Sequence, residues 1–295
     1  MELSGCGTAL VTPFGADGGL DEPALVRLVN WQIESGIDFL VACGTTGEAS
    51  TMSEAENARV VEIVVNTAAG RVPVFAGCTH NATSEAAARA KKLAKIAGLY
   101  GILTANPYYN RPGQEGQYQH FRSIAEAVEL PVLLYNIPSR TGANMEPATV
   151  LRLAEIANIV GIKESSGNIA QITEILNHAP TGFKVFSGDD AMTLPVIALG
   201  GAGLVSVASN AVPAQMARMV RAALNGDWAT ARAVNTKFFG LMQAHFCEPN
   251  PAPIKAVLAL LGHGADCLRL PMVPVTAHTR QRLHNILAEL GLLAS

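Results

Sequence analysis

The stretch Ile37-Asp38-Phe39-Leu40-Val41-Ala42 runs into Gly44-Thr45-Thr46-Gly47-Glu48 and then into a helical pattern over residues 53–69. The first stretch is a short apolar run, which is typical of a buried parallel strand. The polar turn after it begins with Gly44 and has Gly47 as its next-to-last residue. Ser53 followed by Glu56 has the spacing of a capping box, which satisfies the first free amides of a helix. These residues predict one strand-turn-helix unit.

The same unit recurs along the chain, about eight times, and eight parallel strands are the number that closes a barrel. The predicted strands are residues 7–12, 37–42, 74–78, 101–103, 132–135, 159–163, 184–187 and 203–207. The predicted helices are residues 21–34, 53–69, 83–97, 114–127, 147–156, 169–177, 190–199 and 213–224. We therefore predict an α/β fold, a (β/α)8 TIM barrel.

A doubly wound open sheet produces the same alternation of strands and helices, so periodicity alone does not decide between the two folds. Two observations favour the closed barrel. Eight units are many for one open sheet, and the dinucleotide-binding pattern Gly-x-Gly-x-x-Gly is missing, because Gly5-Cys6-Gly7 lacks the third glycine.

The alternation stops after Asn225-Gly226-Asp227, and only helical patterns follow, over residues 228–244, 253–261 and 276–290. We predict a catalytic barrel over residues 1–226 and a C-terminal helical region, appended to it, over residues 227–295.

Composition excludes several classes of protein. The chain has 295 residues, of which 49% are hydrophobic, and its net charge of −3 comes from dispersed residues, so nucleic-acid binding is not expected. The most apolar stretch, residues 194–212, is interrupted by proline and glycine, which argues against a membrane span. No signal peptide is visible at the start, and the five cysteines are far apart, so we expect a cytoplasmic protein. The histidines do not cluster, and no metal site is predicted.

In a closed barrel the functional site lies at the carboxyl ends of the strands. Lys163 ends the apolar run Ile159-Val160-Gly161-Ile162, where a low-dielectric wall lowers the pKa of an amine and frees its lone pair to attack a carbonyl. This placement predicts Schiff-base chemistry. The alternatives are a lysine that extends to solvent or one that pairs with Glu164.

Other polar residues follow the remaining strands. Phenols and neighbouring hydroxyls can relay a proton, and a turn with free amides and a nearby arginine can each hold a carboxylate. The candidates for these roles are Tyr108, Tyr109, Tyr135, Thr45, Thr46 and Arg140. Each of them could instead serve only packing, turn formation or the surface. Asp189 and Asp190 are adjacent, and we interpret Asp190 as a helix N-cap rather than as half of a catalytic pair.

Three motifs carry a family resemblance. They are Pro107-Tyr108-Tyr109-Asn110-Arg111-Pro112, Tyr135-Asn136-Ile137-Pro138-Ser139-Arg140-Thr141-Gly142 and Glu248-Pro249-Asn250-Pro251. With the turn at residues 44–48 and with Lys163, they make the chain resemble the dihydrodipicolinate synthase family. This family belongs to the pyruvate-dependent class I aldolases, which include N-acetylneuraminate lyase. The resemblance runs nearly end to end.

The resemblance implies a lyase of lysine and diaminopimelate biosynthesis that condenses pyruvate with L-aspartate 4-semialdehyde and needs no cofactor. Lys163 would form the imine with pyruvate, and Thr45, Tyr135 and Tyr109 would relay protons, with Tyr109 reaching into a neighbouring subunit of a homotetramer built as a dimer of dimers. The implied substrate-binding residues are Thr46 with Thr45 for pyruvate, Arg140 for the semialdehyde, and the backbone at Gly188 and Val205.

The resemblance also implies a site for inhibition by lysine. It maps to Ala49, Ser50, Glu54, Asn57, Asn81, Glu85 and Tyr108. Lysine-sensitive bacterial members of the family have histidines at the positions of Glu54 and Asn57. We therefore predict weak or absent inhibition.

Three other functions remain open at this stage. A related aldolase could use pyruvate with a sugar acid or an N-acetylneuraminate-type substrate, although Arg140 with Tyr109 suits a short carboxylated acceptor. A barrel that has lost its chemistry could serve in binding or regulation. A phosphate-binding isomerase ranks last, because the segments after strands seven and eight are poor in glycine.

Overall fold

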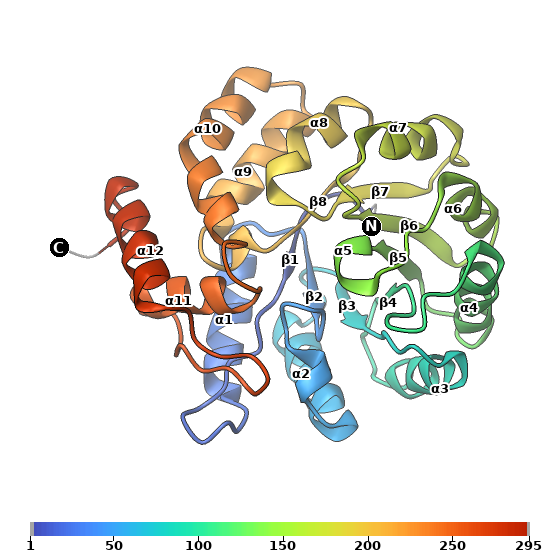
Figure 1. Cartoon of the computed structure of the whole chain (residues 1–295), viewed down its shortest axis with the longest axis horizontal. Helices are drawn as coiled ribbons and strands as arrows, with labels where there is room; N and C mark the ends of the chain where they lie inside the picture. The colour runs from blue at the N-terminus through green and yellow to red at the C-terminus, as the bar shows by residue number, and fades with distance from the viewer. Residues whose placement is uncertain (1–2, 294–295) are drawn as a thin grey trace.

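The computed structural model describes residues 3–293, and within them eight parallel strands form a closed barrel (Figure 1). Each strand pairs with the next along the chain, and β8 pairs with β1. The strands are β1 (Gly5–Ala9), β2 (Phe39–Ala42), β3 (Val74–Gly77), β4 (Gly101–Ala105), β5 (Val132–Asn136), β6 (Ile159–Glu164), β7 (Lys184–Ser187) and β8 (Gly203–Ser206). The closed barrel confirms the predicted fold and excludes the open sheet.

Helices surround the barrel on its outer face (Figure 1). They are α1 (Glu22–Glu34), α2 (Glu54–Ala68), α3 (Thr83–Leu93), α4 (Gln114–Glu126), α6 (Pro147–Ala154), α7 (Ile169–His178), α8 (Thr193–Ala198) and α9 (Pro213–Leu224). The short helix α5 (Pro138–Thr141) directly follows β5 and lies inside this ring of helices, in front of the barrel (Figure 1). Three short 3-10 turns occur at η1 (Ala49–Thr51), η2 (Asp190–Met192) and η3 (Ala208–Asn210).

Most boundaries differ from the predicted ones by one to three residues, and three differences are larger. The helix predicted over 83–97 ends at Leu93, and Gly98, at φ 86°, turns the chain toward β4. The helix predicted over 190–199 is divided into η2 and α8. The short helix α5 was not predicted, because a four-residue helix between Ile137 and Gly142 has too few turns to show a periodic pattern.

Aromatic and branched side chains fill the barrel interior. Phe39 lies at the centre, with ring centroids 5.2 Å from Phe186 and 6.1 Å from Phe75. Gly7 makes room for it, because a methyl group there would overlap the Phe39 ring. Tyr135 and Val205 belong to the same interior cluster, so the core continues upward into the carboxyl end of the barrel. The site therefore rests on close-packed side chains.

Three further helices follow the barrel, α10 (Trp228–Ala244), α11 (Ala252–Leu260) and α12 (Ala277–Glu289). Helix α10 packs along α9, α11 contacts η3, and α12 packs against α10 and α11 (Figure 1). The predicted C-terminal helices are thus confirmed. The division into a barrel of 226 residues and a separate helical region stays a prediction, although Gly226 at φ 79° forms the turn between α9 and α10.

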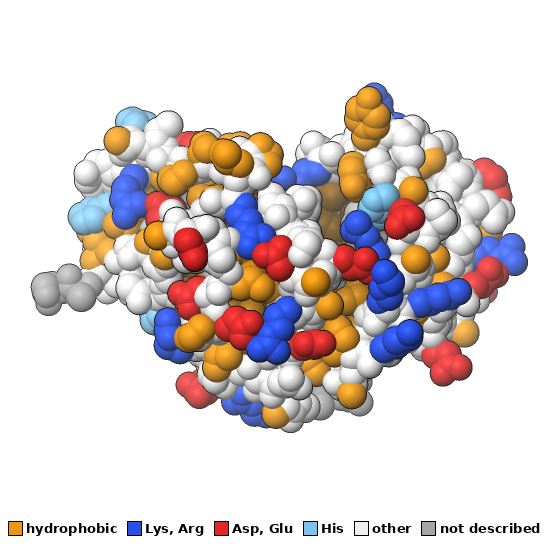
Figure 2. All heavy atoms as spheres, turned by 90° about the horizontal axis from the view of Figure 1, so that it is seen from below, with side chains coloured by type: hydrophobic (Ala, Val, Ile, Leu, Met, Phe, Trp, Pro, Cys, Tyr) orange, Lys and Arg blue, Asp and Glu red, His pale blue; other side chains and the backbone are white. Residues whose placement is uncertain are grey.

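The surface carries charges of both signs side by side, as Figure 2 shows for the face seen from below. Within residues 3–293, none of the helices is long and apolar enough to cross a bilayer. In the same range, the structure places no group of three or more His, Cys, Asp or Glu side chains that could hold a metal ion.

Candidate active site

The predicted site residues lie at one end of the barrel because they end strands or directly follow them. Tyr135 and Lys163 are register partners on the neighbouring strands β5 and β6. Thr45 and Thr46 follow β2, and Arg140 lies on α5 just after β5. A parallel barrel brings the carboxyl ends of all its strands to the same rim, so residues far apart in the sequence converge there.

Lys163 is buried, with 5% of its surface exposed. Burial lowers the pKa of its amine to about 8; the Asp190 carboxylate opposes this shift, and the Arg140 guanidinium adds to it. No carboxylate among residues 3–293 forms an ion pair with its Nζ, which lies 4.4 Å from the centroid of the Tyr135 ring. Near neutral pH, a usable share of Lys163 is therefore the uncharged, nucleophilic amine.

Glu164 does not neutralise Lys163, because the two side chains of adjacent strand residues point to opposite faces. The Glu164 carboxylate accepts hydrogen bonds from Asn136 Nδ2 at 3.0 Å and Gln171 Nε2 at 3.2 Å, outside the barrel interior. Both alternatives for Lys163, a solvent-exposed lysine and a pair with Glu164, are thereby excluded.

Tyr135 places its phenol beside Lys163. Burial raises the pKa of this phenol to about 12, although the Ser165 and Thr45 hydroxyls and the Arg140 charge partly offset the effect. The phenol thus stays protonated over the physiological pH range and can donate a proton. The Thr45 hydroxyl that interacts with this phenol belongs to an exposed residue.

The turn after β2 leaves two amides free to bind an anion. Gly47 N donates to Gly44 O at 3.1 Å and Glu48 N to Thr45 O at 3.1 Å, so these two amides close the turn itself. Nothing among residues 3–293 accepts a hydrogen bond from the amides of Thr45 and Thr46. Two free N–H groups in one turn suit a small carboxylate.

Asn250, to which sequence analysis gave no role, contacts both Thr46 in the turn after β2 and Arg140 on α5. Its Nδ2 donates to Thr46 Oγ1 at 3.0 Å, and its backbone oxygen accepts from Arg140 Nη2 at 3.2 Å. Asn250 lies in the Glu248-Pro249-Asn250-Pro251 motif, which is the one sequence feature that could have identified it as a site residue. The C-terminal region therefore contributes directly to the rim of the barrel.

Gly188 and Val205 occupy supporting positions. A methyl group at Gly188 would lie 2.9 Å from Lys163 Cε and would overlap the Ser165 hydroxyl, so only glycine leaves Lys163 room to move. Val205 is fully buried in the barrel interior and is the register partner of Gly7. Neither residue is part of the lining of the cavity described below.

Tyr109 is not brought to the other candidates within one chain. It is 89% exposed and has a left-handed backbone, at φ 73°. Tyr108 beside it is 39% exposed. Such exposure is unusual for a large aromatic side chain. Of the three residues predicted for the relay, Thr45 and Tyr135 lie at the same end of the barrel, and the role of all three, including Tyr109 in a neighbouring subunit, stays a prediction.

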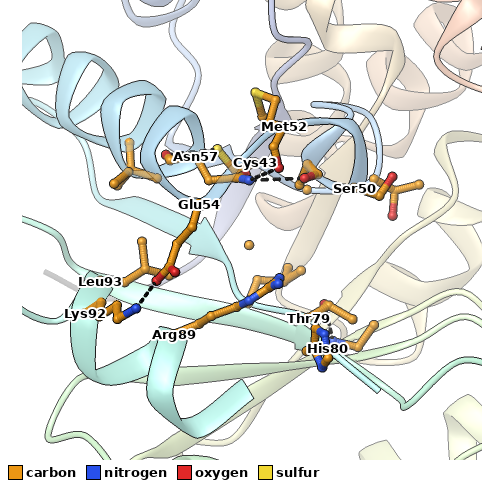
Figure 3. Close-up of a pocket in the computed structure, with 18 of the residues that line it drawn as sticks. Cys43, Ser50, Met52, Glu54, Asn57, Thr79, His80, Arg89, Lys92 and Leu93 are labelled. Atoms are coloured by element: carbon orange, nitrogen blue, oxygen red, sulfur yellow. Dashed lines mark hydrogen bonds and ion pairs between the residues drawn. The ribbon is translucent and has the colours of Figure 1, made fainter. Parts of the chain in front are cut away.

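A cavity of about 1,320 Å³ opens from the site toward α2 and α3 (Figure 3). Thr45, Tyr135 and Arg140 line its inner part. Five of the residues predicted for a lysine site line its outer part, namely Ala49, Ser50, Glu54, Asn57 and Tyr108, whereas Asn81 and Glu85 are not in the lining. The two predicted sites thus share this cavity in part, although Lys163 and Thr46 are not in its lining.

Two polar side chains of the outer cavity are already engaged. Glu54 pairs with Lys92 Nζ at 2.7 Å, and Asn57 Nδ2 donates to the backbone oxygens of Ala49, Met52 and Ser53 (Figure 3).

The interpretation of Asp190 as a helix cap is wrong. Asp189 is the N-cap of η2 and accepts from Ala191 N at 2.9 Å. The buried Asp190 carboxylate instead accepts from the Ser206 hydroxyl and from the amides of Val207 and Ala208. It therefore fixes the loop after β8, a contact that no local sequence pattern reveals.

The comparisons with known proteins agree with this geometry. The family model described as the Dihydrodipicolinate synthetase family matches residues 2–290. The chain belongs to this family. A 4-hydroxy-tetrahydrodipicolinate synthase of Acidobacterium capsulatum is 61% identical, over 99% of this chain and 97% of the relative. One of Koribacter versatilis is 57% identical, over 99% and 98%.

Solved structures of the dihydrodipicolinate synthase family share the complete fold. A chloride-inhibited enzyme from Acinetobacter baumannii complexed with pyruvate has a TM-score of 0.96 and 40% identity, covering 98% of this chain and 99% of that one. A Cyanidioschyzon merolae enzyme with lysine bound has a TM-score of 0.95 and 41% identity, with the same coverage. The predictions of family and fold are both confirmed.

Proposed function

We propose that this chain is a 4-hydroxy-tetrahydrodipicolinate synthase, a Schiff-base-forming lyase that condenses pyruvate with L-aspartate 4-semialdehyde in the biosynthesis of lysine and diaminopimelate. The observation that carries the proposal is Lys163, a buried amine with a pKa of about 8 at the end of β6, beside the phenol of Tyr135. The relatives with 61% and 57% identity bear the same enzyme name.

The reaction begins when the neutral Lys163 amine attacks the keto carbon of pyruvate. Loss of water gives an imine, and removal of a proton from the pyruvate methyl group gives an enamine. The enamine carbon then forms a bond to the aldehyde carbon of the semialdehyde, whose oxygen takes up a proton. The amino group contributed by the semialdehyde then attacks the imine carbon, which closes the ring of the product and releases the Lys163 amine. The one water lost overall is the water released when the first imine forms.

The other residues bind and move protons. Thr45 and Thr46 hold the pyruvate carboxylate through their free amides, and Arg140 holds the carboxylate of the semialdehyde. Tyr135 and Thr45 pass protons between the intermediates and solvent. Tyr109 completes this relay from a neighbouring subunit, which makes oligomerisation part of catalysis, and we propose a homotetramer built as a dimer of dimers. The backbone at Gly188 and Val205 borders the pocket.

An assay of the purified protein with both substrates tests the proposal, with product followed through a coupled reductase that oxidises a nicotinamide cofactor. Efficient turnover is the expected result. If pyruvate is trapped by borohydride while the semialdehyde is not consumed, the chain is a related aldolase with another aldehyde, such as a sugar acid. If neither occurs, the proposal is wrong.

We further propose that lysine inhibits weakly or not at all. Glu54 is paired with Lys92, and Asn57 Nδ2 already donates to three backbone oxygens, so the Glu54 carboxylate is not free for a new ammonium group and the Asn57 nitrogen is not free for a new carboxylate group. A lysine titration of the coupled assay is expected to leave most of the activity at millimolar lysine. Strong inhibition below millimolar concentrations would contradict this.

A further inference from the structure

A buried ion pair connects the pyruvate-binding turn to the C-terminal helices. Glu48 ends the turn, Lys255 lies on α11, and their side chains are 1% and 2% exposed, respectively. Glu48 is the left-handed residue of the turn, at φ 53°, which an L-residue with a side chain seldom adopts. Such a backbone persists only where the surrounding contacts impose it.

The side-chain partners of Glu48 come from the chain after residue 250, whereas its backbone bonds to Thr45 and Thr51 close to the turn. Besides the pair with Lys255, its Oε2 accepts a hydrogen bond from the backbone N of Arg269 at 3.1 Å. Two residues before the left-handed position, Thr46 accepts from Asn250. All three side-chain contacts therefore link the turn to the segment from Asn250 to Arg269.

Lys255 is itself held in a fixed place. Its Nζ donates to Cys267 O at 2.8 Å and lies 4.3 Å from the centroid of the Phe14 ring. The Arg269 guanidinium is 4.4 Å from the centroid of the same ring, and it pairs with Glu56 at 2.6 Å. The cation is thus surrounded by an aromatic ring and a carbonyl, and Glu48 is the one carboxylate that neutralises it among the described residues.

We propose that Glu48 is a positioning residue for pyruvate, and that its buried pair with Lys255 holds the Thr45 and Thr46 amides in the geometry that binds the carboxylate. This inference rests on the proposed function, because it assigns the C-terminal helices a part in substrate binding. Buried ion pairs add little net stability compared with apolar side chains of similar size, but moving one charge away from its partner leaves that partner buried and unpaired, which is costly.

Four variants distinguish a role of the ion pair in positioning the turn from a role in the stability of the fold alone. Glu48→Gln and Lys255→Met each leave one charge buried without its partner. The double variant Glu48→Gln with Lys255→Met removes both charges, and its glutamine oxygen can still accept from Arg269 N. Arg280→Gln is the control for a general disturbance of the same segment, because it breaks an ion pair with Asp266 at 2.6 Å, beside Cys267, and leaves the pair of Glu48 with Lys255 in place.

The readouts are the thermal midpoint, the KM for pyruvate and the pyruvate concentration that half-saturates borohydride trapping. We expect both single variants to melt earlier and to raise the KM for pyruvate by about tenfold, with kcat changed much less. The double variant is expected to recover the midpoint but to keep the raised KM. Arg280→Gln is expected to lower the midpoint at unchanged KM.

The inference is overturned if the double variant recovers the wild-type KM together with the midpoint, or if Arg280→Gln raises the KM equally. Either result would mean that the pair serves stability alone. A wild-type protein that traps no pyruvate would contradict the proposed function, and the inference with it, before any variant is compared. Trapping needs no second substrate, so the identity of the aldehyde does not affect the result.

Discussion

Lys163→Ala is expected to lose the covalent capture of pyruvate and to lower kcat by at least about 10⁴-fold. Lys163 is the amine that burial makes nucleophilic, with a pKa of about 8, and the phenol beside it cannot form an imine. The shortened side chain leaves a small void in a packed barrel but no unpaired charge, so the fold should survive. Mass spectrometry after borohydride reduction with pyruvate measures the capture directly.

Lys237→Ala serves as the matched control, because Lys237 is an exposed lysine on α10 and is not part of the cavity lining. It should trap pyruvate as the wild type does and show wild-type turnover. Full-yield trapping by the Lys163 variant would show that the nucleophile is assigned to the wrong lysine.

Arg140→Ala is expected to separate the two half-reactions. Pyruvate trapping should stay near the wild-type level, whereas kcat/KM for the semialdehyde should fall by about 10²- to 10³-fold, the loss typical of a charge-assisted pair with a carboxylate. The guanidinium lines the cavity, and its Nη2 is positioned by Asn250 O at 3.2 Å. Steady-state kinetics with each substrate varied in turn measures the separation.

Arg140→Lys tests the geometry of the same contact, because an ammonium keeps the charge but loses the planar, two-pronged donor. It should recover only part of the loss. Arg152→Ala, which removes an exposed arginine paired with Glu115 on the helical surface, should leave both steps unchanged. Loss of pyruvate trapping in Arg140→Ala would place Arg140 at the pyruvate subsite instead.

Much of the candidate site could be predicted because strand ends are visible in the sequence. An apolar run that stops at Lys163 or at Tyr135 marks the rim of the barrel, since parallel strands all end on the same face. Asp190 shows where such local reasoning fails. Its position before a helical pattern indicated a cap, but its carboxylate reaches across to the loop after β8.

The sequence by itself determined the repeated strand-helix units, the family resemblance and the positions of Lys163, Tyr135, Thr45 and Arg140 at strand ends. These features arise from residues that are close together in the sequence, so a local sequence pattern is enough to reveal them. Only the tertiary structure decided that Asn250 binds Thr46 across 204 residues of sequence and that Glu48 pairs with Lys255. The physical reason is that such contacts depend on how the C-terminal helices pack against the barrel, and no local pattern encodes that packing.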